Sequence, residues 1–126
     1  MMNNRKDITT EEDIQVMVHR FYAQVRNNAI LSPIFNTVVG DSWDHHLQVM
    51  CNFWSSMLLY TRKYLNDPMT KHLPLPLQPL HFEEWLRLFA QTIDAYFEGP
   101  LAEEAKRRAT VIARLMQYTI NAGNDK

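Results

Sequence analysis

The chain contains little glycine and little cysteine. Among its 126 residues there are only three glycines and a single cysteine, Cys51. So few glycines, and no segment in which β-branched and polar residues alternate, argue against a sheet and predict an all-α fold. One cysteine excludes an internal disulfide and is typical of a reducing cytoplasm.

Long apolar runs and an excess of charge are also absent. No stretch reaches the roughly 18 apolar residues of a membrane span, and the opening MMNNRKD lacks the apolar run of a signal peptide. The net charge of −1 provides no basic surface to hold phosphates, which argues against nucleic acid as a partner. We expect a cytoplasmic protein with no membrane partner, either a monomer or a weak dimer. Its length suits a single domain over residues 1–126, with flexible ends at residues 1–8 and 121–126.

Apolar residues, at 46% of the chain, recur with helical spacing in four long segments. We expect these helices to run from Thr9 or Thr10 to Asn27, from Asp41 or Ser42 to Tyr64, from Leu80 or His81 to Gly99, and from Leu101 to Asn121, the first opened by a Thr9-x-x-Glu12 capping box. Residues 29–35 read as a short helix or turn and residues 37–41 as a loop. The predicted inward stripes are Ile14, Val18, Phe21, Tyr22 and Val25; Trp43, His46, Met50, Phe53, Trp54 and Met57; Phe82, Trp85, Leu86, Phe89, Ile93 and Phe97; and Leu101, Ala105, Ile112, Leu115, Met116 and Thr119.

A short segment around His72 is the most informative part of the sequence. Asp67 is a good N-cap, Pro68 fits the first helical position and Pro74 prevents continuation, so one helical turn is expected there. The prolines of residues 74–79 favour an extended path after it. Such a turn is too short to contribute much to the core, but it would hold one imidazole in a fixed position, as an axial haem ligand requires. The sequence therefore predicts a haem pocket with His72 on the proximal side.

The other expected helices supply polar side chains for the opposite, distal side of such a pocket. Tyr22, His46 and Trp85 are the candidates, and each donor aimed at a partly negative bound gas is worth roughly 1–3 kcal/mol in a dry site. Taken singly, each of them also suits an ordinary helical core. His81 competes for the proximal role, or contacts a haem propionate at the start of its helix. The candidate pocket walls are Phe21, Met50, Phe53, Trp54, Met57 and Phe89.

Three other functional classes are alternatives to a haem pocket with one axial histidine. His46 could bind the iron as a sixth ligand, which would make the protein an electron-transfer or sensor module. A carboxylate-bridged di-iron bundle is disfavoured, because no histidine has a glutamate three residues before it. A helical interaction module without a cofactor stays open.

Five short motifs, in order along the chain, resemble the group III, or P-type, truncated haemoglobins, which are small bacterial globins. The motifs are Phe21-Tyr22-Ala23-Gln24-Val25-Arg26, Leu31-Ser32-Pro33-Ile34-Phe35, Trp43-Asp44-His45-His46-Leu47 with Phe53-Trp54, Pro68-Met69-Thr70-Lys71-His72, and His81-Phe82-x-x-Trp85-Leu86. The resemblance covers roughly residues 14–118, which is nearly the whole chain. The proline-dense stretch at residues 74–79 departs from the family pattern and puts the rigidity of the proximal side in question.

The resemblance implies a two-over-two helical sandwich around haem b. It implies His72 as the proximal ligand, with Tyr22, His46 and Trp85 on the distal side. The implied ligands are diatomic gases: dioxygen, carbon monoxide and nitric oxide. Three distal donors would slow dioxygen release, which argues against bulk transport. Slow release instead favours a redox or detoxifying role, such as nitric oxide dioxygenation or peroxide turnover, with an unidentified reductase.

Overall fold

The computed structural model describes residues 5–62 and 78–124, with side chains placed up to residue 118. Within those ranges the regular structure is entirely helical, as the sequence predicts. The helices are α1 (Glu11–Arg26), α2 (Ser32–Val39), α3 (Trp43–Leu59), α5 (Pro79–Tyr96) and α6 (Pro100–Asn124).

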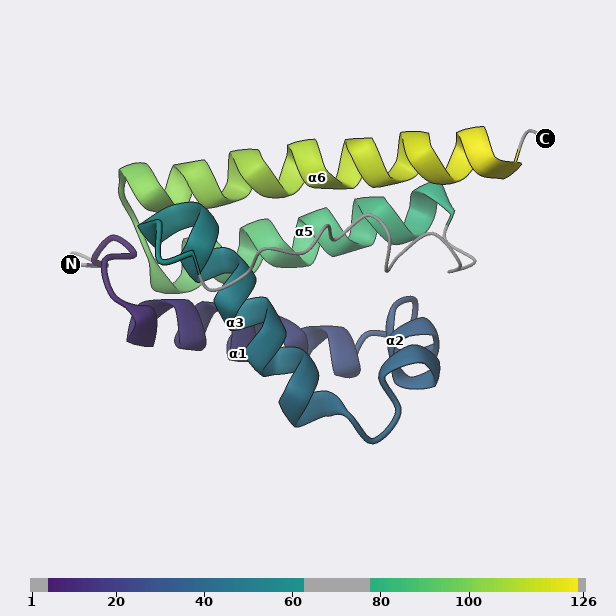
Figure 1. Ribbon diagram of the computed structural model, residues 1–126, viewed down its shortest axis with the longest axis horizontal. Helices are drawn as coiled ribbons and strands as arrows, with labels where there is room; N and C mark the ends of the chain where they lie inside the picture. The colour runs from purple at the N-terminus through teal and green to yellow at the C-terminus, as the bar shows by residue number, and fades with distance from the viewer. Residues whose placement is uncertain (1–4, 63–77, 125–126) are drawn as a thin grey trace.

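The helices form two crossing pairs. α5 and α6 run antiparallel and side by side, while α3 crosses α1 on the other side of the molecule (Figure 1). α1 also packs against α5, so that it joins the two pairs. The core lies where the pairs meet and centres on Phe21 of α1 and Phe89 of α5, which are 2% and 1% exposed. The two-over-two helical sandwich is confirmed.

The start of α1 lies one residue later than the predicted capping box. Thr10, not Thr9, is the N-cap, and its hydroxyl accepts a hydrogen bond from the N–H of Asp13 at 3.1 Å. The carboxylate of Asp13 in turn accepts from the N–H groups of Thr9 and Thr10 at 3.0 and 3.1 Å. The shift follows from the reciprocal pairing, because an aspartate at the third helical position closes the box as a glutamate would. The predicted inward stripe of this helix is buried throughout, together with Met17.

Two boundaries around the α2–α3 connection differ from expectation. α2 runs through Val39, so most of the loop predicted at residues 37–41 is helical; Pro33 fits its first turn and the Thr37 hydroxyl bonds the carbonyl of Pro33. α3 ends at Leu59 rather than Tyr64, because Tyr60 has φ of 60° and Arg62 has φ of 61°. Two left-handed residues so close together cannot continue a right-handed helix.

The described N-terminal segment, residues 5–8, contacts the start of α6. Ile8 is fully buried, and the carboxylate of Asp7 accepts hydrogen bonds from the N–H groups of Leu101 and Ala102 at 2.9 and 2.8 Å. These N–H groups open α6, so a side chain 94 residues away caps this helix. Gly99, with φ of 146°, leaves room for the carboxylate, since a Cβ there would lie 2.5 Å from Asp7 Cγ. Residues 5–8 thus pack against the start of α6, and α6 continues to Asn124.

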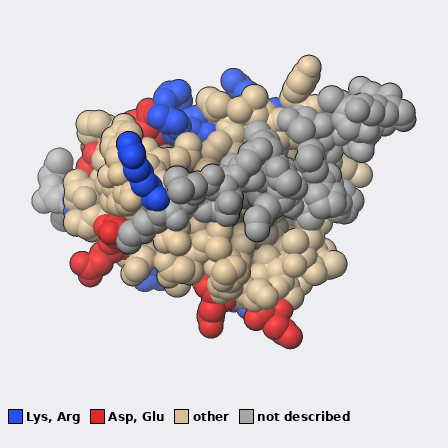
Figure 2. Space-filling view, viewed as in Figure 1, with Lys and Arg blue, Asp and Glu red and all other residues tan. Residues whose placement is uncertain are grey.

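The surface carries charges of both signs. On the face in Figure 2, several Asp and Glu side chains protrude along the lower edge, and uncharged side chains cover much of the described surface between the charges. No helix in the described part of the chain is both apolar enough and long enough to cross a bilayer.

Candidate functional site

An aromatic cluster occupies the space between the helix pairs and contains most of the candidate site residues. Phe21 lies at its centre, with ring centroids 4.9 Å from Tyr22, 5.5 Å from Trp85 and 5.2 Å from Phe89. All three contacts are edge-to-face, the arrangement that ring quadrupoles favour. Phe21 therefore connects the predicted distal residues Tyr22 and Trp85, which come from different helices.

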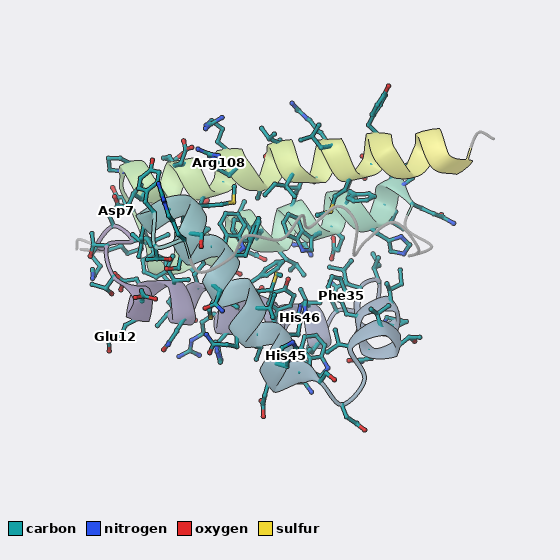
Figure 3. The ribbon with its side chains drawn as sticks, viewed as in Figure 1. Asp7, Glu12, Phe35, His45, His46 and Arg108 are labelled. Carbon is teal, nitrogen blue, oxygen red and sulfur yellow. The ribbon has the colours of Figure 1, made fainter. Side chains whose placement is uncertain are left out.

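His46 lies among three aromatic rings at one end of this cluster. Its centroid is 5.0 Å from that of Tyr22, 5.6 Å from that of Trp43 and 6.5 Å from that of Phe35. The imidazole is nearly perpendicular to the first two rings, at 86° and 87°. Its Nε2 atom is buried. Figure 3 shows His46 on the side of α3 toward Phe35 of α2, whereas the neighbouring His45 is exposed.

Tyr22 brings a protonated phenol to this end of the cluster. The residue is 5% exposed. Burial, with a smaller contribution from Cys51, raises the pKa of Tyr22 well above its usual value of 10.0. The same burial raises the pKa of the Cys51 thiol. Desolvation disfavours the phenolate, so Tyr22 keeps its O–H at any physiological pH and can act as a hydrogen-bond donor.

Trp85 of α5 stands in a stack of three rings. It lies parallel to Phe89 at 5.6 Å and 7°, and Phe89 lies on Trp54 of α3 at 5.0 Å and 21°. Trp54 and Phe89 are buried, whereas Trp85 is half-buried. The stack joins α3 to α5 and fixes the plane of the Trp85 indole, whose N–H can only donate.

α3 presents two adjacent stripes rather than the single inward face predicted from its sequence. Trp43, Cys51, Trp54 and Leu58 are buried in the core. Beside them runs a half-buried stripe at i, i+4, i+7 and i+11, made up of His46, Met50, Phe53 and Met57. Apolar side chains that stay partly exposed next to a filled core are what a bound apolar group would cover.

His81 occupies the first turn of α5 and takes part in its N-terminal cap. Its Nδ1 accepts a hydrogen bond from the N–H of Gln78 at 2.9 Å, and the N–H of His81 bonds the carbonyl of Gln78 at 2.9 Å. Such a bond places the ring proton on Nε2, so in this tautomer Nε2 can donate a hydrogen bond but has no lone pair free for iron. This geometry agrees with the helix-start role considered for His81.

His72, the predicted proximal ligand, lies outside the described residues, as does the helical turn expected around it. In the residues that are described, His, Cys, Asp and Glu side chains form no group of three or more able to hold a metal ion. The sequence predicts Trp43 on the same helix face as His46, but neither Trp43 nor Phe35 was counted among the candidate site residues. The three-residue spacing of Trp43 and His46 on one helix could have identified Trp43, but Phe35 reaches the site only through the fold.

The fold and this cluster define a globin, and comparison with known proteins agrees. Residues 6–121 match the bacterial-like globin family. The chain is 36% identical over 111 residues to the group 3 truncated haemoglobin ctb of Campylobacter jejuni, covering 85% of this chain and 87% of that protein. It is 28% identical over 109 residues to the group 2 truncated haemoglobin YjbI of Bacillus subtilis, covering 84% and 82%.

Solved structures give the same result. A crystal structure of a group III truncated haemoglobin from Campylobacter jejuni matches with a TM-score of 0.84 and 32% identity, covering 92% of this chain and 94% of that one. A group II truncated haemoglobin from Bacillus anthracis matches with a TM-score of 0.73 and 28% identity, covering 86% and 85%. The chain belongs to the bacterial-like globin family and, within it, to the truncated haemoglobins.

Family membership implies a haem-binding globin, and the described residues fit that group. A porphyrin needs a broad apolar wall, which the half-buried stripe Met50, Phe53 and Met57 and the stacked Trp85 supply. The iron side needs polar hydrogen atoms close to that wall, and the buried phenol of Tyr22 beside the imidazole of His46 supplies them. This donor set fits the distal side of a haem pocket.

Proposed function

We propose that the protein binds haem b through His72 and holds dioxygen and other diatomic gases on the side lined by Tyr22, His46 and Trp85. When bound, haem supplies an iron atom with an open coordination position. The observation that carries the proposal is the buried, protonated phenol of Tyr22 with its ring 5.0 Å from that of His46. A core would not normally bury two polar rings together without a use for their polar atoms.

Each distal residue has a distinct part in this proposal. Tyr22 donates its hydroxyl proton to a ligand that carries partial negative charge. Trp85 holds its indole on the Phe89 ring and offers its N–H from the opposite helix. His46 closes the site from α3 between the Tyr22 and Trp43 rings. The apolar stripe of α3 excludes water, so each hydrogen bond to the ligand is stronger than it would be in water.

Several donors around one small ligand would slow its release. Each is worth roughly 1–3 kcal/mol in a dry site, and 1.4 kcal/mol corresponds to tenfold in a dissociation rate constant. Slow release suits chemistry on the held gas more than bulk transport. We therefore infer a redox or detoxifying role in the cytoplasm, such as nitric oxide dioxygenation or peroxide turnover, with electrons from a separate reductase.

Absorption spectra test the first part of the proposal. Purified protein is reconstituted with haem, and ferric, ferrous and carbon monoxide spectra are recorded for the unaltered chain and for His72→Ala. The expected result is a Soret band that shifts with carbon monoxide and is lost or displaced in His72→Ala. No Soret shift on adding haem would leave a helical module without cofactor. Sharp split visible bands in the gas-free ferrous protein, abolished by His46→Ala, would instead indicate His46 as a sixth ligand.

Dioxygen dissociation rates test the second part. Tyr22→Phe keeps the ring and its packing but removes the O–H, so we expect dissociation about 10- to 100-fold faster. Trp85→Phe is expected to act in the same direction. Equally fast dissociation in the unaltered protein and both variants would remove the slow-release argument while leaving haem binding intact.

A further inference from the structure

Arg26, in the last turn of α1, lies over the Trp43 ring at the start of α3. Its guanidinium carbon is 4.5 Å from the ring centroid, well within the range of a cation–π contact. Trp43 is 7% exposed, whereas Arg26 is an exposed residue. The guanidinium therefore covers the outer side of an otherwise buried indole and connects the end of α1 to the beginning of α3.

The ring that Arg26 covers also forms part of the surroundings of His46. Trp43 contacts His46 at 5.6 Å and Tyr22 at 6.0 Å. Because the imidazole stands at 87° to the Trp43 ring and 86° to the Tyr22 ring, it cannot turn far without displacing one of them. Tyr22 is held from inside by Phe21 at 4.9 Å, so Trp43 is the ring that can move more easily.

We propose that Arg26 is a positioning residue, which holds Trp43 against His46 and thereby fixes the orientation of the distal imidazole. The inference rests on the proposed gas-binding function, because His46 affects a ligand only if the ligand binds beside it. Loss of the cation releases Trp43, broadens the range of His46 orientations and opens the path past His46. The guanidinium suits this role better than an ammonium, since its plane can lie flat on an indole.

The chain offers a matched control on the same helix. Arg20 lies over the Tyr96 ring, with its guanidinium carbon 5.4 Å from the centroid. Tyr96 is 41% exposed and is not among the rings that contact His46 or Tyr22 in the described part of the chain. Arg20→Met therefore removes an interaction of the same kind from α1 without affecting the aromatic cluster, while Arg26→Met removes the one that borders it.

The test uses the ferrous carbon monoxide complex of the reconstituted protein. Infrared spectra of bound carbon monoxide report the polar groups that face it, and flash photolysis gives its rebinding rate. An exposed cation–π contact is worth about 0.5–1 kcal/mol, so we expect Arg26→Met to rebind carbon monoxide about two- to fivefold faster. It is also expected to redistribute the infrared bands. Arg26→Lys should fall between Arg26→Met and the unaltered protein, and Arg20→Met should match the unaltered protein in both measurements.

Two results would overturn the inference and leave gas binding standing. One is an Arg26→Met protein with unchanged bands and rebinding; the other is an equal change in Arg20→Met, which would indicate general loosening of α1. Thermal unfolding of both variants detects such loosening directly. Failure of the unaltered protein to bind carbon monoxide would instead refute the proposed function and this inference with it.

Discussion

The corner where the N-terminal segment meets α6 and the cluster around His46 are held together by different forces. At the corner, Asp7 accepts hydrogen bonds from the N–H groups of Ile8, Leu101 and Ala102 at 2.8–2.9 Å. Around His46, the aromatic side chains contact one another through their rings, at centroid distances of 5.0–6.5 Å. Directed polar bonds thus characterise the corner, and packed rings characterise the cluster.

The difference separates what stabilises the fold from what prepares the site. The first N–H groups of a helix lack partners within the helix, so a cap such as Asp7 satisfies a requirement of the backbone. Ring contacts fix the planes of Tyr22, His46 and Trp85 by packing, and the polar atoms at the ring edges can then serve a ligand. We therefore expect substitutions at the corner to change stability alone, and substitutions in the cluster to change ligand kinetics as well.

The largest expected effect in this comparison is at the centre of the cluster. Phe21→Ala removes a fully buried ring with three edge-to-face partners, which typically destabilises a protein by about 3–5 kcal/mol. Phe35→Ala, at a half-buried ring with contacts to Tyr22 and His46, is the milder control. Urea unfolding of both variants measures the free energies. A loss in Phe21→Ala no greater than in Phe35→Ala would mean that Phe21 is not the centre of the core.

The second-largest effect on stability is expected at the corner where Asp7 caps α6. Asp7→Ala leaves the N–H groups of Leu101 and Ala102 without their carboxylate partner and removes a negative charge from the start of α6. We expect a loss of about 2 kcal/mol in urea unfolding, with carbon monoxide rebinding unchanged. Asp7→Asn, which keeps one acceptor oxygen, should lose less. A change in rebinding rate would contradict the separation of the two regions.

Much of the fold was predictable from local sequence because helical periodicity is strong in this chain. The inward stripe of α1 and the four crossing segments follow from the spacing of apolar residues. The boundaries were less accurate. The end of α3 depends on the left-handed backbone of Tyr60, and no proline or glycine at this point of the sequence indicates it. The start of α6 depends on Asp7, which is distant in sequence.

The last helix shows a second limit of periodicity. Leu115 is predicted to face inward but is 51% exposed, whereas Ala102, Ala105, Ala109 and Ala113 are at most 3% exposed. α6 packs on α5 through this alanine stripe, because small side chains allow two helices to approach closely. The spacing of apolar residues predicts both Leu115 and Ala105 to be buried, and only the packing of α6 on α5 shows that the alanine face is the buried one.

The sequence predicts which face of its helix each candidate site residue occupies, but not how these residues are arranged in space. Tyr22, His46 and Trp85 each lie on the predicted apolar faces, and the structure brings them to one aromatic cluster. The contribution of α2 through Phe35, and the cation over Trp43, depend on how α1, α2 and α3 meet. Local periodicity carries no information about such tertiary contacts. The proximal assignment of His72 stays a prediction.

A smaller effect is expected from the capping box of α1. Burial alone would raise the pKa of Asp13, but hydrogen bonds from Lys6, Thr9 and Thr10 outweigh it and lower the pKa from 3.8 to about 2. A carboxylate with a lowered pKa stabilises the fold above its ordinary pKa. This contribution, about 1 kcal/mol after solvent screening, is lost as the pH falls from about 4 to about 2.

Unfolding of the haem-free protein between pH 5 and pH 2 measures this contribution. Other carboxylates, including Glu84 and Glu104, titrate in the same range, so the comparison with Asp13→Asn isolates one group. The asparagine variant should be less stable at pH 5 and approach the unaltered protein near pH 2. Parallel curves over the whole range would mean that the Asp13 carboxylate is not held as described.

The smallest effect on stability is expected from Glu104, an acidic residue in the first turns of α6. Glu104 pairs with Arg107 and Arg108 on the same helix, and these hydrogen bonds lower the pKa of Glu104 to about 2. All three side chains lie at the surface, where salt screens them and side-chain entropy opposes the pairing. We expect Glu104→Gln to leave the thermal midpoint within experimental error at physiological salt, in contrast to Asp7→Ala. A loss as large as that of Asp7→Ala would show that charge near the start of α6, and not the capping of its N–H groups, is what stabilises the corner.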